Sequence, residues 1–149
     1  MTTVELAGMI ERASRLIVYR DGAPLTELRG VLRSLLERVL AVPNDLTWPE
    51  DVEPIYRYAE FRGQVERAWP ELGFHDADIG GNLDVDAIVE VGDAIDDLTD
   101  IAVDLDKAMQ LARVDEAGAW SWLRFAADVH WGEHVLDLDR HLARREGQG

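Results

Sequence analysis

One stretch near the C-terminus constrains the fold more than any other part of the chain. Residues 120–141 read WSWLRFAADVHWGEHVLDLDRH and carry three of the five tryptophans and three of the four histidines. At about 100° per residue, a helical wheel gives this stretch an apolar stripe formed by Trp120, Ala127, Trp131, His134, Leu138 and Leu142. Trp122, Phe125 and Val129 lie on other sides, which is typical of a helix enclosed by its neighbours. We therefore expect this helix to be central in an all-α helical bundle.

The remaining apolar periodicity predicts four more helices, in a single domain that takes in the whole chain. Helical spacing gives the expected bounds as 3–20, 25–41, 54–68 and 86–112, followed by the C-terminal helix over 116–145. Pro54 suits the first turn of the third helix, and Asp84 or Asp86 suits the N-cap of the fourth. The connection over residues 70–84 is longer than an ordinary loop. We expect it to be either a mobile segment or a functional one.

Two of these helices carry definite predictions about what they bury. The third should turn inward Ile55, Tyr56 or Tyr58, Phe61, Val65 and Trp69. The fourth should carry a seam for another helix, made of Ile88, Val91, Ile95, Leu98, Ala102, Leu105, Met109 and Ala112. Trp48 should anchor the connection over residues 42–53 to the core.

Charge and missing residue types exclude several classes of function. The formal net charge is −15, so we expect no nucleic-acid partner, because such partners are held by basic patches. The chain has no cysteine, which excludes disulfides, zinc–thiolate sites and cysteine catalysis. The start MTTVEL is not a signal peptide, and no apolar run nears the length of a membrane span. We expect a cytoplasmic protein with no membrane partner.

The predicted fourth helix carries a ridge of acidic side chains. The wheel gathers them opposite the apolar seam, and they are Asp86, Glu90, Asp93, Asp96, Asp97, Asp100 and Asp104. Like charges four residues apart each cost about 0.2–0.5 kcal/mol, so arginines, cations or a basic partner must offset the repulsion. An exposed ridge of this kind would attract a basic protein partner electrostatically. We therefore interpret the ridge as a candidate partner-binding surface.

The histidines of the last helix form a second candidate site, for a divalent metal ion. The residues that share a narrow sector of the wheel, so that one ion could contact two of them, are His130, His134, Asp137 and His141. Gly132 lies between the histidines at a cost of about 1 kcal/mol relative to alanine, which indicates close packing or room for a ligand. At the edge of the ridge, Asp97, Asp104 and Glu90 could reach this helix and form a mixed Asp/His site. The alternative is that the histidines only pack and form hydrogen bonds.

Two catalytic motifs are matched only in part. Residues 130–134, HWGEH, fit the H-x-x-E-H pattern of zinc peptidases, in which Glu133 would activate water, but a third ligand is not evident. Residues 96–100, DDLTD, fit the D-D-x-x-D pattern that binds magnesium–diphosphate in isoprenoid synthases, but a second copy is missing. No nucleophile elbow, P-loop or Rossmann glycine pattern is present. We expect no cofactor, with a divalent metal as the alternative, and a binding protein rather than an enzyme.

Two motifs in the last third of the chain carry a family resemblance. Residues 93–105 read DAIDDLTDIAVDL, and residues 120–134 read WSWLRFAADVHWGEH. In this order they resemble the bacterial family catalogued as domain of unknown function 5063, whose members have a D-D-L-x-D-I helix followed by an H-W-G-x-H helix. The matching residues are Asp96, Asp97, Leu98, Asp100, Ile101, Asp104, Trp120, Trp122, Phe125, His130, Trp131, Gly132 and His134. The resemblance implies a small, all-helical bacterial protein and supplies no catalytic residues.

Three hypotheses about function follow. The first is a non-catalytic interaction or inhibitor-type protein that presents the acidic ridge and the 70–84 segment to a basic partner. The second is a metal-binding helical bundle, or a small metal-dependent hydrolase, that uses His130 and His134. The third is a structural dimer that shares the seam of the fourth helix. We accordingly expect a monomer or a homodimer.

Overall fold

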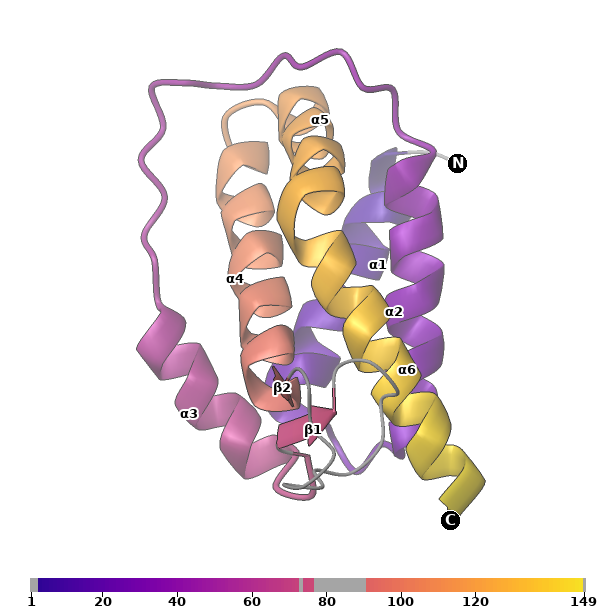
Figure 1. Cartoon of the computed structure of the whole chain (residues 1–149). Helices are drawn as coiled ribbons and strands as arrows, with labels where there is room; N and C mark the ends of the chain where they lie inside the picture. Colours follow the sequence, from indigo (N-terminus) through magenta and orange to yellow (C-terminus); the bar gives the residue numbers. More distant parts are fainter. Residues whose placement is uncertain (1–2, 73, 77–90, 149) are drawn as a thin grey trace.

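The computed structural model describes residues 3–72, 74–76 and 91–148, and it confirms an all-α helical bundle. Its helices are α1 (Thr3–Tyr19), α2 (Leu25–Leu40), α3 (Tyr58–Ala68), α4 (Ala94–Ala112), α5 (Glu116–Ala126) and α6 (Gly132–Gln148). A π-helical segment, η1 (Ala127–Trp131), joins α5 to α6 in one long rod (Figure 1). Two short strands, β1 (Phe74–Asp76) and β2 (Val91–Asp93), pair antiparallel beside the start of α4.

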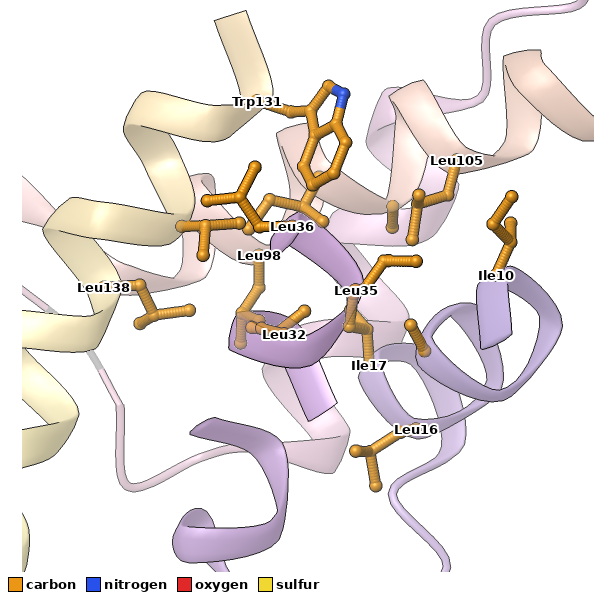
Figure 2. Packing of buried hydrophobic residues seen from close by; sticks show 14 of the residues in the cluster. Ile10, Leu16, Ile17, Leu32, Leu35, Leu36, Leu98, Leu105, Trp131 and Leu138 are labelled. Atoms are coloured by element: carbon orange, nitrogen blue, oxygen red, sulfur yellow. The ribbon is translucent and has the colours of Figure 1, made fainter. Parts of the chain in front are cut away.

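The helices share one apolar core. Helix α4 contacts α1, α3, α5 and α6, while α5 and α6 also pack on α2. Side chains from α1, α2, α4 and the rod point into a common cluster (Figure 2). The predicted burial of Trp120, Trp122 and Trp131 is confirmed, and Trp131 is fully inaccessible to solvent. Val129, by contrast, is 60% exposed, so the outer face of the rod is open to solvent rather than enclosed.

Helix α3 begins four residues later than the sequence predicts. It starts at Tyr58, and Pro54 lies in the extended connection that runs over one end of the bundle (Figure 1). The side-chain amide of Gln110 accepts the Ile55 N–H at 2.9 Å and donates to the Ile55 carbonyl at 3.2 Å. These two bonds tie Ile55 to α4 in extended conformation, because its backbone groups are then not available to a helix. Ile55 is 69% exposed, so its predicted place in the core is wrong.

The rest of the predicted inward set of α3 is largely confirmed. Phe61, Val65 and Trp69 are buried, whereas Tyr56 is exposed. Trp48 is half-buried, and its ring centroid lies 5.2 Å from that of Phe125.

Helix α4 also begins later than predicted, at Ala94 rather than residue 86. Asp93 is its N-cap, and the carboxylate accepts the Asp96 N–H at 3.0 Å. Val91, which the sequence assigned to the seam, belongs to β2 and pairs with Asp76. The predicted caps Asp84 and Asp86 lie outside the described residues. An aspartate that caps a helix satisfies one of its free N–H groups, and Asp93 is the residue that does so here.

The predicted uninterrupted fifth helix is wrong at one turn, where η1 inserts an extra residue. Leu123 and Val135 are both buried, yet in a continuous α-helix they would lie about 120° apart. The extra residue in η1 offsets about 100° of this rotation. The side chains of Leu123 and Val135 therefore both face the core. The N–H of Gly132 donates to the Ala127 carbonyl, and a Cβ on Gly132 would lie 2.1 Å from that oxygen. Gly132 is therefore explained by the π-turn itself.

Arg20 makes several contacts from the turn between α1 and α2. Arg20 has a positive φ of 62°, and its side chain donates to the carbonyls of Ala23 and Ala68 at 2.8 and 3.0 Å. It also forms two hydrogen bonds of 2.8 Å to the carboxylate of Glu71 and lies 4.1 Å from the ring centroid of Trp69. Arg20 thus connects this turn to the end of α3.

Candidate functional site

Two histidines of the rod lie against the aspartates of α4. His130 belongs to η1 and His134 to the first turns of α6. Nδ1 of His130 lies 2.7 Å from Oδ2 of Asp104, and Nδ1 of His134 lies 2.7 Å from Oδ1 of Asp97. Nε2 of His134 is 3.3 Å from Oδ2 of Asp100. The two imidazole rings meet edge to face, with centroids 4.9 Å apart.

The acidic ridge is not the solvent-facing surface that the sequence predicts. Asp97 and Asp104 are only 6% and 7% exposed, and both contact histidines of the rod. The wheel is misleading here because α4 packs on α1, α3 and the rod, so the side that bears Asp97 and Asp104 is covered by the rod instead of facing solvent. The narrower expectation that Asp97 and Asp104 could reach the last helix is confirmed, and Asp100 joins them.

Other members of the ridge are neutralised by α3. Arg62 lies 3.0 Å from Asp93 and 3.7 Å from Asp96, and the Tyr58 hydroxyl donates to Asp96. Burial and the hydrogen bond to Asp96 raise the pKa of Tyr58 to about 12, so the phenol keeps its proton. The predicted ridge residues Asp86 and Glu90 lie outside the described residues. Arginine from a neighbouring helix is thus part of what offsets the repulsion along α4.

Two of the four predicted metal ligands are not part of the histidine site. Asp137 pairs with Arg140 on the surface at 2.5 Å. His141 is buried in the bundle, about two turns beyond His134 along α6. His141 shares a sector of the wheel with His134 but lies about 10 Å farther along the helix axis, at about 1.5 Å per residue. Asp137 is close to His134 along the axis, but its carboxylate contacts Arg140. Within the described residues, the group that could hold an ion is Asp100, His130 and His134.

The electrostatics of this group reflect several carboxylates in a partly buried place. Burial and the neighbouring charge of Asp96 raise the pKa of Asp100 to about 6, although the histidines oppose this shift. Burial raises the pKa of Asp104, against the hydrogen bond from His130. Burial alone would lower the pKa of His134, but the hydrogen bond to Asp97 and the nearby carboxylates outweigh it and raise the pKa. The negative charge of these carboxylates therefore favours either a protonated histidine or a bound cation at this position.

The three donor atoms are arranged so that a metal ion could bind between them. One ligand atom each from Asp100, His130 and His134 lie within 4.8 Å of one another. At metal–ligand distances of about 2.0–2.2 Å, two ligands of a tetrahedral ion lie about 3.4 Å apart. The 3.3 Å between His134 Nε2 and Asp100 Oδ2 already fits that edge, so only His130 needs to move inward, by at most about 1.4 Å.

The Nδ1 atoms of both histidines are already engaged. A carboxylate only accepts hydrogen bonds, so Nδ1–H donates to Asp104 in one ring and to Asp97 in the other. Nε2 of each ring is then the nitrogen that could bind a metal ion, and in His134 it lies 3.3 Å from Oδ2 of Asp100. A carboxylate on the far nitrogen of a metal-binding histidine fixes the tautomer and the ring orientation, and raises the basicity of the ligating nitrogen. The sequence signal for these partners is the spacing of Asp97, Asp100 and Asp104, which places all three along one side of α4.

The partial catalytic motifs are not assembled as their patterns require. Glu133 is exposed, which agrees with a solvated side chain and does not place it as a water-activating base. In the D-D-x-x-D segment, Asp96 contacts Tyr58 of α3, whereas Asp97 and Asp100 contact His134 of the rod. The segment therefore divides its carboxylates between two neighbouring helices.

Comparisons with protein-family models, with curated proteins and with solved structures find no match for this chain. The resemblance to domain of unknown function 5063 stays a prediction. Among the described helices, none combines the length and the apolar character that crossing a membrane requires.

Proposed function

We propose that this helical bundle binds a divalent transition-metal ion through Nε2 of His130, Nε2 of His134 and Oδ2 of Asp100. The observation that carries this proposal is the pair of 2.7 Å contacts that fix Nδ1 of each histidine to a carboxylate of Asp104 or Asp97. Each ring is thus held by its own carboxylate of α4, while one ligand atom each from His130, His134 and Asp100 lie within 4.8 Å of one another. Two imidazoles and one carboxylate suit zinc, iron(II) and related ions.

The site is of the open kind. The side chain of His130 is 45% exposed, and those of His134 and Asp100 are partly exposed, so solvent reaches the metal position. Three protein ligands leave at least one coordination position of a tetrahedral ion for water or a substrate atom. This favours an exchangeable or catalytic ion over a purely structural one. A small metal-dependent hydrolase is the enzyme class that such a centre supports.

The geometry supports this function better than a surface for a basic partner. Asp97 and Asp104 are buried, and Asp93 and Asp96 already contact Arg62, so much of the predicted ridge is not available to another protein. Asp100, the other ridge residue that the structure describes, faces His134. The ridge carboxylates within the described residues are thus engaged within the fold.

Metal analysis of untagged protein tests the proposal. The protein should bind one equivalent of zinc after dialysis, and calorimetry should give an affinity that falls about a hundredfold or more in His134→Ala and in Asp100→Asn. Asp137→Asn is the matched control, because it removes a nearby carboxylate of α6 that pairs with Arg140, and its affinity should equal that of the wild type. A wild-type protein that binds neither zinc, manganese nor iron(II), or equal binding by His134→Ala, would contradict the proposal.

A further inference from the structure

We propose that Asp96 is a reserve metal ligand that Tyr58 and Arg62 of α3 hold outside the coordination sphere, so that one coordination position stays open. This inference rests on the proposed metal site and concerns the number of protein ligands that the ion takes. Helix α3 carries no metal ligand itself, but through Tyr58 and Arg62 it would limit the number of protein ligands on the ion.

Asp96 is well placed to become a ligand. It lies one helical turn before Asp100 on α4, on the same side of the helix. Its side chain contacts that of Asp100, and its charge acts on His134. The side chain is 39% exposed, so it has room to rotate. A modest rotation about the side-chain torsions would bring a second carboxylate of α4 toward the ion.

Two contacts from α3 oppose this rotation. The Tyr58 hydroxyl donates to Oδ1 of Asp96, and Nη1 of Arg62 lies 3.7 Å from the same oxygen. Nη1 of Arg62 also donates to the Tyr58 hydroxyl at 3.2 Å, while its Nη2 donates to Asp93 at 3.0 Å. Because Asp93 caps α4, Arg62 is fixed at the start of the helix that carries the ligands. The restraint on Asp96 is therefore built into the packing of α3 against α4.

The number of ligands decides what the ion can do. With three protein ligands a tetrahedral ion keeps a position for an external molecule, whereas a fourth protein ligand closes the site, as in structural zinc sites. Removing the Tyr58 hydroxyl should thus strengthen metal binding while it weakens binding of an external ligand to the ion. If Tyr58 merely stabilised the site, removing its hydroxyl should instead weaken metal binding.

Cobalt(II) is the probe, because its visible spectrum reports changes in coordination. Full-length protein freed of metal is titrated with cobalt(II), and azide is then added as the external ligand. Tyr58→Phe should bind cobalt(II) about tenfold more tightly than the wild type, with an altered spectrum and weaker azide binding. Tyr56→Phe, which changes an exposed tyrosine that does not contact Asp96, is the matched control and should behave as the wild type. In the double variant Tyr58→Phe/Asp96→Asn, this increase in cobalt(II) affinity should be lost.

The outcomes separate this inference from the proposed function. If the wild type binds cobalt(II), His134→Ala does not, and Tyr58→Phe is unchanged or weaker, the reserve-ligand inference is overturned and the metal site stands. If the wild type does not bind cobalt(II), the metal site fails. Asp96→Asn alone gives a test that does not depend on the folding of Tyr58→Phe. It should retain affinity within about threefold, and a tenfold or greater loss would mean that Asp96 is already a ligand.

Discussion

We expect Gly132→Ala to destabilise the protein because of the π-turn, although the same substitution stabilises an ordinary helix. In an ordinary helix interior, replacing glycine by alanine stabilises by about 1 kcal/mol. At Gly132 the new Cβ would lie 2.1 Å from the carbonyl oxygen of Ala127 and 3.0 Å from its carbon. Ordinary van der Waals separation requires this peptide to retreat by roughly 1 Å or more, in a segment that is fixed between the buried residues Ala126 and Trp131.

The magnitude follows from what the retreat disrupts. It breaks the hydrogen bond from the Gly132 N–H to Ala127, which costs about 1–3 kcal/mol for a buried group. Overpacking of the surrounding core adds about 1–3 kcal/mol. After the gain in helix propensity is subtracted, Gly132→Ala should lower the free energy of unfolding by roughly 3 kcal/mol. Loss of the extra residue from the turn would cost at least as much, since it would rotate Val135 and Leu138 away from the core.

Urea unfolding at 25 °C in the presence of EDTA measures this change without any contribution from a bound metal. The midpoint for Gly132→Ala should fall by about 1–2 M with an unchanged slope. Gly8→Ala in α1 is the matched control, because a Cβ at that exposed position meets nothing within 4 Å, and it should raise stability by up to about 1 kcal/mol. If Gly132→Ala were as stable as Gly8→Ala, the close contact with Ala127 would not exist and the account of η1 would be refuted.

Three further predictions concern other contacts. Arg20→Lys should lower the free energy of unfolding by about 1–2 kcal/mol, because lysine cannot reproduce the paired hydrogen bonds to Glu71 or the stacking on Trp69, and thermal unfolding would measure it. Arg20 holds the pKa of Glu71 below its ordinary value of 4.5, so this carboxylate stabilises the fold above that pH and loses its contribution as the pH falls through the lowered pKa. The stability difference between wild type and Glu71→Gln, roughly 1 kcal/mol or less at pH 7, should thus shrink below about pH 4.5 in urea titrations, and a constant difference would contradict the pairing. Zinc at a hundred times its dissociation constant should raise the free energy of unfolding by about 2.7 kcal/mol, an increase that EDTA reverses and that His134→Ala lacks in the same assay.

Much of the fold can be predicted from periodicity because apolar spacing is a local property. The buried tryptophans of the rod and the inward face of α3 follow directly from it. The starts of α3 and α4 do not, because they depend on contacts distant in sequence. Gln110 holds the backbone of Ile55 across 55 residues, and β2 takes its partner from residues 74–76. No local pattern in either segment records these partners.

The residues of the candidate site can be predicted from the sequence, but their grouping only in part. The sequence predicts His130 and His134 as metal ligands and places Asp97, Asp100 and Asp104 on the acidic ridge, from which it allows only Asp97 and Asp104 to reach the last helix. A helical wheel assumes a constant angle per residue, and the extra residue in η1 breaks that assumption midway along the rod. It also shows one helix at a time, so it does not show that α4 is covered on the side that bears these aspartates. The pairing of the two helices is what converts two separate patterns into one site.

The hydrogen bond from the Trp131 indole N–H to the Leu123 carbonyl, at 3.1 Å, spans the π-turn from one side to the other. This bond stiffens the junction, so α5 and α6 should move together as one rigid body, without a hinge between them. Any displacement of His130 toward an incoming ion must then come from rotation of its own side chain, or from a slight tilt of the whole rod against α4.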